Sequence, residues 1–475
     1  MKNHFVPFAG FFLLAASLAG CASFQSHPIV PADTASVFEA RTLHSAGLKQ
    51  FLERNLRQKA IPWPARSWNL ETLTLAAFYY SPDLDVARAK WGVAEAGMIT
   101  AGARPNPNLG ISAQHNNNAP NGVSPWSLGW NLDITIETAG KRGYRLEHAQ
   151  HLSEAARFNI ASIAWQVRGQ VRANLLELSG ARESEALLSQ QEAVQKDLVG
   201  LLERRLASGD ISLPIVTQAR IALEQTRLAL RDAQMRRSEA LARLAAAIGL
   251  PASALEGVSL SLEDITRIPA DANLTSSDVR RQALLNRADI LAALAEYEAS
   301  QSALRTEIAK QYPDIGLGPG YLWDAGQVKW SLGLSLVPPI LNRNEGPIAE
   351  TEARRKQAAA TFIALQAKVI GEIDLALRSY RAALEKTTAA ETVLASQKRY
   401  QQSVGAQFNA GEADRLSLLS ARLELSAAEL ARLQAVMTAQ QALGRLEDAM
   451  QRPAASEPPL SAMIEKTPRT EENNP

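Results

Sequence analysis

The sequence predicts a mainly α-helical protein with a small β part, built from two copies of one unit. Three observations predict this class: long stretches with helical period, short stretches in which apolar and polar residues alternate, and an internal repeat. The repeat has a period of about 204 residues, and Trp126–Gly129 recurs unchanged as Trp330–Gly333. With one cysteine and a net charge of +1 among 475 residues, the chain lacks the features of disulfide scaffolds, cysteine metal clusters and nucleic-acid binders.

The N-terminus predicts a bacterial lipoprotein signal. The apolar run Phe5–Ala16 is too short to span a bilayer, and the sequence Leu-Ala-Gly-Cys that ends at Cys21 matches a lipobox. We therefore expect residues 1–20 to be a signal peptide and Cys21 to be lipidated, at the start of an N-terminal segment, 21–69. The alternative is an ordinary signal peptide with an incidental cysteine. By resemblance to sorted lipoproteins, Ala22 indicates the outer membrane.

The two repeats are expected at 70–253 and 287–453, with a linker at 254–286 between them. Each repeat has the same order of a helical stretch, two alternating stretches, a very long helix, a break at glycine and a shorter helix. Residues 454–475 are rich in Pro, Glu and Asn, and this composition predicts a disordered tail.

In the first repeat we expect helices over Leu70–Ala103, about Tyr144–Ala207 and about Pro214–Ile248. The apolar residues from Ile160 to Leu178 are spaced 3, 4, 4, 4 and 3 apart, which is the period of an α-helix. At ~1.5 Å per residue the long helix would extend about 96 Å. The two shorter helices, stacked end to end, would match that length. This predicts a wall of helices, two layers high, around a common axis.

The alternating stretches predict four membrane-spanning β-strands. The stretch that begins at Trp126 alternates without a break over twelve residues, and similar stretches surround Leu109, Ile315 and Trp330. Such strands need about 9–11 residues with apolar side chains toward lipid. The alternative is an amphipathic sheet on a soluble core, but the opposite face is too glycine-rich for a soluble exterior. Four strands cannot close a barrel, and an open edge in lipid is costly, so several chains must assemble it.

Together these features resemble the TolC family, the outer-membrane factors of tripartite efflux systems. Matching marks are Pro82-Asp83-Leu84 and Arg104-Pro105-Asn106-Pro107, and Glu137–Arg142 looks like the strand exit of the heavy-metal efflux branch. The resemblance implies a homotrimer with a 12-strand barrel in outer-membrane lipid and a periplasmic α-barrel of long helices. It also implies a passive conduit, with a periplasmic adaptor (membrane fusion) protein and an inner-membrane pump as partners. The alternative is a periplasmic coiled-coil adaptor lipoprotein.

The resemblance further implies that the two glycine breaks are periplasmic tips that contact the adaptor. The tips comprise Ala207, Ser208, Gly209, Asp210 and Ile211 in the first repeat, and Ala410, Gly411, Glu412, Ala413 and Asp414 in the second. The residues expected at the pore aperture are Asp414, Arg415, Ser417 and Ser420. Ser420 departs from the family, because many members carry an acidic residue there. The glycines would also serve as helix C-caps.

Enzyme chemistry is not indicated, and we expect no cofactor and no nucleic-acid partner. His148 and His151 lie three residues apart in a helical stretch, but no third ligand is evident, so we expect a solvated helix face and no metal site. Asp133 and Glu137 either line a cation path or belong to a solvated lumen face. The sequence does not specify the cargo, because in such systems the pump selects it.

Overall fold

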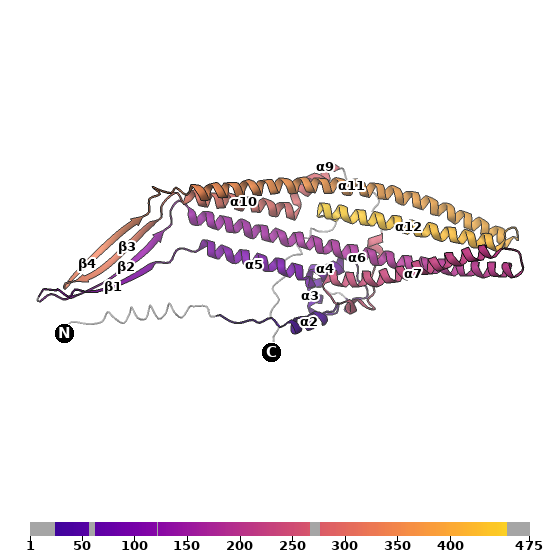
Figure 1. The fold of residues 1–475 in the computed structure, drawn as a ribbon, viewed down its shortest axis with the longest axis horizontal. Coiled ribbons are helices and arrows are strands. Elements are labelled where there is room, and N and C mark those ends of the chain that lie inside the picture. The colour runs from indigo at the N-terminus through magenta and orange to yellow at the C-terminus, as the bar shows by residue number, and fades with distance from the viewer. Residues whose placement is uncertain (1–23, 57–61, 121, 267–275, 454–475) are drawn as a thin grey trace. The chain divides into compact units, whose positions relative to one another are not determined.

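A computed structural model describes residues 24–56, 62–120, 122–266 and 276–453 (Figure 1). The chain forms two units, of which the first extends to Thr42 and the second begins at Leu43. The first unit contains helix α2 (Pro31–Glu39), which has no buried residue. The predictions for the signal peptide, for Cys21 and for the C-terminal tail concern residues outside the described ranges.

The second unit contains the two repeats, preceded by α3 (Ala46–Asn55) and α4 (Leu70–Tyr80). The first repeat consists of α5 (Pro82–Gly102), β1 (Asn108–His115), β2 (Trp126–Ile136), α6 (Lys141–Ala207) and α7 (Leu213–Ile248). The second consists of α10 (Ala288–Ala309), β3 (Ile315–Asp324), β4 (Gln327–Leu336), α11 (Glu345–Asn409) and α12 (Arg415–Met450). The short helices between them are η1 (Ala252–Leu255), α8 (Glu263–Thr266) and α9 (Ser276–Asn286). The shared element order confirms the predicted duplication.

The stretch that we expected as one helix over Leu70–Ala103 is two helices, so this prediction was wrong. Ser81 ends α4, and its side chain accepts a hydrogen bond from the backbone N–H of Leu84 at the start of α5. Pro82 occupies the first turn of α5, where its missing N–H costs nothing. The serine cap and the proline therefore start a new helix instead of continuing the old one.

The long helix of each repeat is flanked by shorter helices that pack along it. In the first repeat α5 (21 residues) and α7 (36 residues) both pack against α6 (67 residues). Polar contacts place α5 beside the start of α6 and α7 beside its end, because Arg142 bonds to Gly102 and Glu203 pairs with Arg220. The apolar stripe of α6 is buried as predicted, with Val171, Leu175 and Leu178 fully covered. No helix in the described ranges is both long and apolar enough to cross a membrane.

The four strands form one antiparallel sheet in the order β1-β2-β3-β4, so the central pair β2–β3 joins the two repeats. Trp130 of β2 lies opposite Ile111 of β1 and Tyr321 of β3, and Tyr321 lies opposite Trp330 of β4. Because side chains alternate between faces, this register gathers the apolar residues on one face. That face is uncovered in the single chain, since Trp330 is 73% exposed. The four predicted strands and their alternation are thus confirmed.

Candidate functional site

The two tips have the same backbone geometry. At the first tip Gly209 donates to the carbonyl of Leu206, and Asp210 donates to that of Arg205; Gly411 and Glu412 repeat this pattern at the second tip. Gly209 and Gly411 have φ of +83° and +81°. This pairing is the Schellman cap, which needs a left-handed residue and so favours glycine. The predicted C-cap role of both glycines is confirmed.

An ion pair joins the two tips. Arg205, in the last turn of α6, places Nη2 2.9 Å from Oδ2 of Asp414. Asp414 is the N-cap of α12, and its Oδ1 accepts hydrogen bonds from the backbone N–H and the hydroxyl of Ser417. These hydrogen bonds from Ser417, together with the bond from Arg205, lower the pKa of Asp414 to about 2. The carboxylate therefore stays ionised and paired throughout the physiological pH range.

The structure brings together only part of the predicted aperture set. Asp414 and Ser417 are in direct contact, whereas Arg415 and Ser420 have exposed side chains on the first turns of α12. Their neighbours Leu419 and Ala421 are buried. Sequence reasoning missed Arg205, because a basic residue in a last helical turn is explained equally well by the helix dipole.

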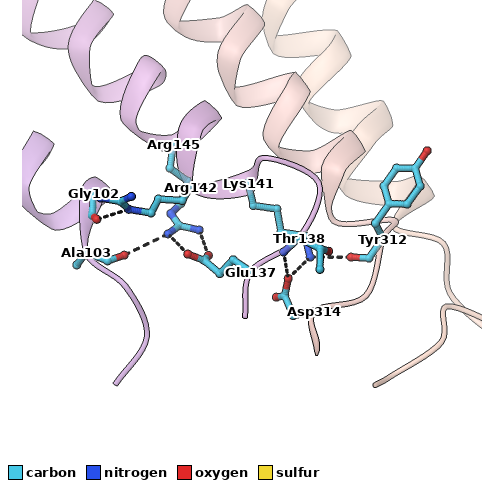
Figure 2. A network of polar contacts seen from close by, with 9 residues as sticks. All are labelled: Gly102, Ala103, Glu137, Thr138, Lys141, Arg142, Arg145, Tyr312 and Asp314. Atoms are coloured by element: carbon cyan, nitrogen blue, oxygen red, sulfur yellow. Dashed lines mark hydrogen bonds and ion pairs between the residues drawn. The ribbon is translucent and has the colours of Figure 1, made fainter. Parts of the chain in front are cut away.

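Figure 2 shows a second polar network, where the sheet meets the helices. Lys141, the first residue of α6, is buried and donates to the carbonyl of Tyr312 and to the carboxylate of Asp314, both at 2.6 Å. The backbone N–H of Thr138 donates to the same carboxylate oxygen at 3.0 Å. Burial raises the pKa of Asp314, but the bonds from Lys141 and Thr138 outweigh it, so the pKa lies below its usual value.

The same network also holds the end of α5. Arg145 forms a bidentate pair with Glu137, and Arg142 donates to the carbonyl of Gly102 at 2.6 Å (Figure 2). The hydrogen bond from Arg145 to Glu137 raises the pKa of the Arg145 guanidinium. Glu137–Arg142 therefore fixes the exit of β2 against α5 on one side and against the α10–β3 connection on the other.

A third contact joins the repeats within the helical wall. The carboxylate oxygen Oε2 of Glu447, on α12, lies 3.0 Å from Nη1 of Arg168 and 3.4 Å from Nε of Arg172, both on α6. All three side chains are more than nine-tenths buried. Burial lowers the pKa of Arg172, and the Glu447 charge opposes that shift. Nη1 of Arg172 also donates to the carbonyl of Gln440 at 2.9 Å.

Each of the two histidines contacts another group of the protein. His148 contacts the carbonyl of Ala299 at 2.8 Å, and His151 lies 3.8 Å from Glu154. Among the residues that the structure describes, no three or more His, Cys, Asp or Glu side chains gather as metal ligands would.

Comparisons with known proteins agree with this architecture. The family described as outer membrane efflux protein matches residues 77–250 and 279–451, one match for each repeat. A curated relative is the cobalt-zinc-cadmium resistance protein CzcC from Cupriavidus metallidurans, 24% identical over 76% of this chain and 87% of its own length.

Two solved structures show the same fold. The outer membrane protein VceC from Vibrio cholerae has a TM-score of 0.66 at 21% identity, over 81% of this chain and 96% of VceC. The CmeC outer membrane channel from Campylobacter jejuni has a TM-score of 0.63 at 17% identity, over 92% of this chain and 96% of CmeC. Because the family match spans both repeats, the chain belongs to the outer membrane efflux protein family, also called the TolC family, and is a non-enzymatic outer-membrane channel of tripartite efflux systems.

Proposed function

We propose that three copies of this chain form the conduit. The observation that carries this proposal is the four-stranded sheet, whose outer strands β1 and β4 each have one unpaired edge within the described residues. An unpaired strand edge is very costly in lipid. Pairing of β4 with β1 of the next copy removes both edges, and three copies give twelve strands. The exposed apolar face around Trp330 then meets lipid, and the polar face lines the lumen.

We further propose that the tips contact a periplasmic adaptor, which connects the conduit to an inner-membrane pump. A Cβ placed on Gly209 or Gly411 would meet no atom within 4 Å, so both turns present open surface. The cargo class that we propose is divalent metal cations. The similarity to CzcC, a protein named for resistance to cobalt, zinc and cadmium, supports this class.

Replacement of Gly411 by tryptophan tests the adaptor contact. Loss of the glycine at positive φ costs about 1 kcal/mol, which is too little to unfold the helical wall, but the indole would obstruct docking. We expect normal trimer amounts in the outer membrane and loss of resistance to zinc, cobalt and cadmium. Gly122 has a φ of +88° and equally open space in the β1–β2 loop, so Gly122→Trp is the matched control and should keep resistance. Full resistance in Gly411→Trp would contradict the tip assignment.

Replacement of Asp414 by lysine tests the aperture. It removes the cap of α12 and places a positive charge beside Arg205, which Asp414 now neutralises. We expect a larger ion conductance in planar bilayers, reduced by added salt because the repulsion is screened. Asp414→Asn keeps the capping ability without the charge, so its conductance should lie between those of the lysine variant and the wild type. Equal conductance in all three proteins would exclude Asp414 from the aperture.

The pKa of Asp414 adds a pH test of the same contact. A carboxyl whose pKa is depressed from 3.8 to about 2 loses its partners only as the pH falls through that lower value. Its contribution is therefore complete above about pH 4. We therefore expect that Asp414 causes no change in the planar-bilayer conductance of the wild type between pH 7 and about pH 4.

We propose that Cys21 carries acyl chains and anchors the mature chain to the outer membrane. Its lipobox supports this proposal, and several acyl chains suffice for a stable anchor. The mass of the N-terminal peptide measures the modification, and Cys21→Ser should lack it. The strands should still hold that variant in the membrane.

A further inference from the structure

The polar face of the sheet carries one carboxylate without a partner. Three strand residues on this face are charged: Asp133 on β2, Asp324 on β3 and Lys329 on β4. Asp324 and Lys329 neutralise each other at 3.0 Å, and Asp324 also accepts a hydrogen bond from Ser127. The backbone of Asp133 is paired in the sheet, but its carboxylate forms no hydrogen bond or ion pair with any described residue. The fixed net charge of this face is therefore that of Asp133.

The surroundings of Asp133 leave its carboxylate accessible. A Cβ built on Gly316 would lie 3.1 Å from Oδ1 of Asp133, so the carboxylate lies over a residue without a side chain. On the other side Asp133 is paired with Asn108, a neutral residue. Glu137, four residues further along the chain, differs sharply, because it is held by Arg145. Of the two acidic residues that the sequence offers for a cation path, one is neutralised and one is free.

The tips carry carboxylates of their own: Asp210 accepts a hydrogen bond from the hydroxyl of Ser208, and Glu412 is exposed. Asp414 is paired with Arg205, and Ser420 on α12 carries no charge. Within the sheet, the uncompensated carboxylate lies three residues before the helix-side end of β2.

We propose that Asp133 gives the conduit a preference for cationic solutes. This inference rests on the proposed trimer, in which three Asp133 carboxylates face one lumen. Charged side-chain rings of this kind select for ions of the opposite sign. Their field reaches across the lumen when the Debye length is long, about 30 Å at 0.01 M salt, and is lost when it is about 3 Å at 1 M.

Reversal potentials measured in planar bilayers test the proposal, with the purified full-length protein and a KCl gradient between about 0.01 and 0.1 M. The wild type should favour K⁺ over Cl⁻. Asp133→Asn, which is nearly isosteric, should lower the permeability ratio about fivefold. The conductance of both proteins at 1 M KCl should be equal, because screening removes the effect there.

A second variant separates charge from structure. Asn131 lies on the same face, two residues from Asp133, so Asn131→Asp combined with Asp133→Asn moves the carboxylate without changing its side of the sheet. This double variant should recover the cation preference. The inference is wrong if the double variant does not recover the cation preference. It is also wrong if the Asp133→Asn channel conducts normally with an unchanged K⁺/Cl⁻ permeability ratio. Either result leaves the proposed conduit intact. If the wild type forms no channels at all, the conduit itself is refuted together with the inference.

Discussion

Replacement of Glu447 by alanine should lower the free energy of unfolding by about 3–5 kcal/mol per chain. The variant leaves Arg168 and Arg172 buried between α6 and α12 without their shared carboxylate. The two arginines then have only the carboxyl of Asp448 nearby, whose pKa burial raises to about 6, so their buried charges are poorly compensated. Denaturant titration of the detergent-solubilised protein, followed by circular dichroism, measures the loss.

Two further variants show whether the loss comes from uncompensated charge. Glu424→Ala removes an exposed carboxylate from the same helix and should change stability by less than about 0.5 kcal/mol. Replacing Arg168, Arg172 and Glu447 together by Met, Leu and Leu should recover part of the stability, because it removes the three buried charges together but leaves the oxygens of Gln440 without Arg172. An alanine variant within about 1 kcal/mol of the wild type would show that the ion triad is not a structural requirement.

Leu132→Arg should prevent assembly of the membrane sheet, whereas Asn131→Arg should be tolerated. Leu132 lies opposite Leu109 on the apolar face, and an arginine facing lipid costs about 2–4 kcal/mol at the bilayer midplane. Threefold symmetry would repeat that cost in every trimer. Asn131 lies on the polar face, where its side chain covers Gly110 and an arginine can reach water.

Heat-modifiable migration on detergent gels and the amount of protein in outer-membrane fractions measure this difference. The expected result is loss of the trimer band for Leu132→Arg and a normal band for Asn131→Arg. Equal behaviour of the two adjacent variants would refute the assignment of the faces, since the residues differ mainly in the side of the sheet on which they lie.

The sequence was most informative where structure depends on local periodicity. β2 begins and ends within one residue of the alternation that predicted it, and α6 ends at Ala207 as expected. The alternation also identified the uncovered apolar face, because residues proposed to face lipid need no partner in the chain. The break at Ser81 was missed because the apolar character of the helical stretch continues across it, while the capping serine and the proline act only on the backbone.

The contacts within the candidate site were not predictable in the same way. Arg205 and Asp414 are separated by 209 residues, and Lys141 and Asp314 by 173, so neither pair leaves a local pattern. Glu137 and Asp133 look alike in the sequence, because both occupy polar positions of the same alternating stretch. Only the folded chain shows that an arginine neutralises the first and that glycine lies beside the second.

The ion pairs between repeats have a mechanical consequence for the proposed trimer. Glu447 with Arg168, and Asp414 with Arg205, both tie the first repeat to the second within one chain. These ion pairs would therefore make each chain respond to load as a single body that is stiff across the boundary between its two repeats. In a ring of three such chains, the ion pairs would resist separation at the three boundaries within chains, which leaves the three boundaries between chains as the places where the ring can widen.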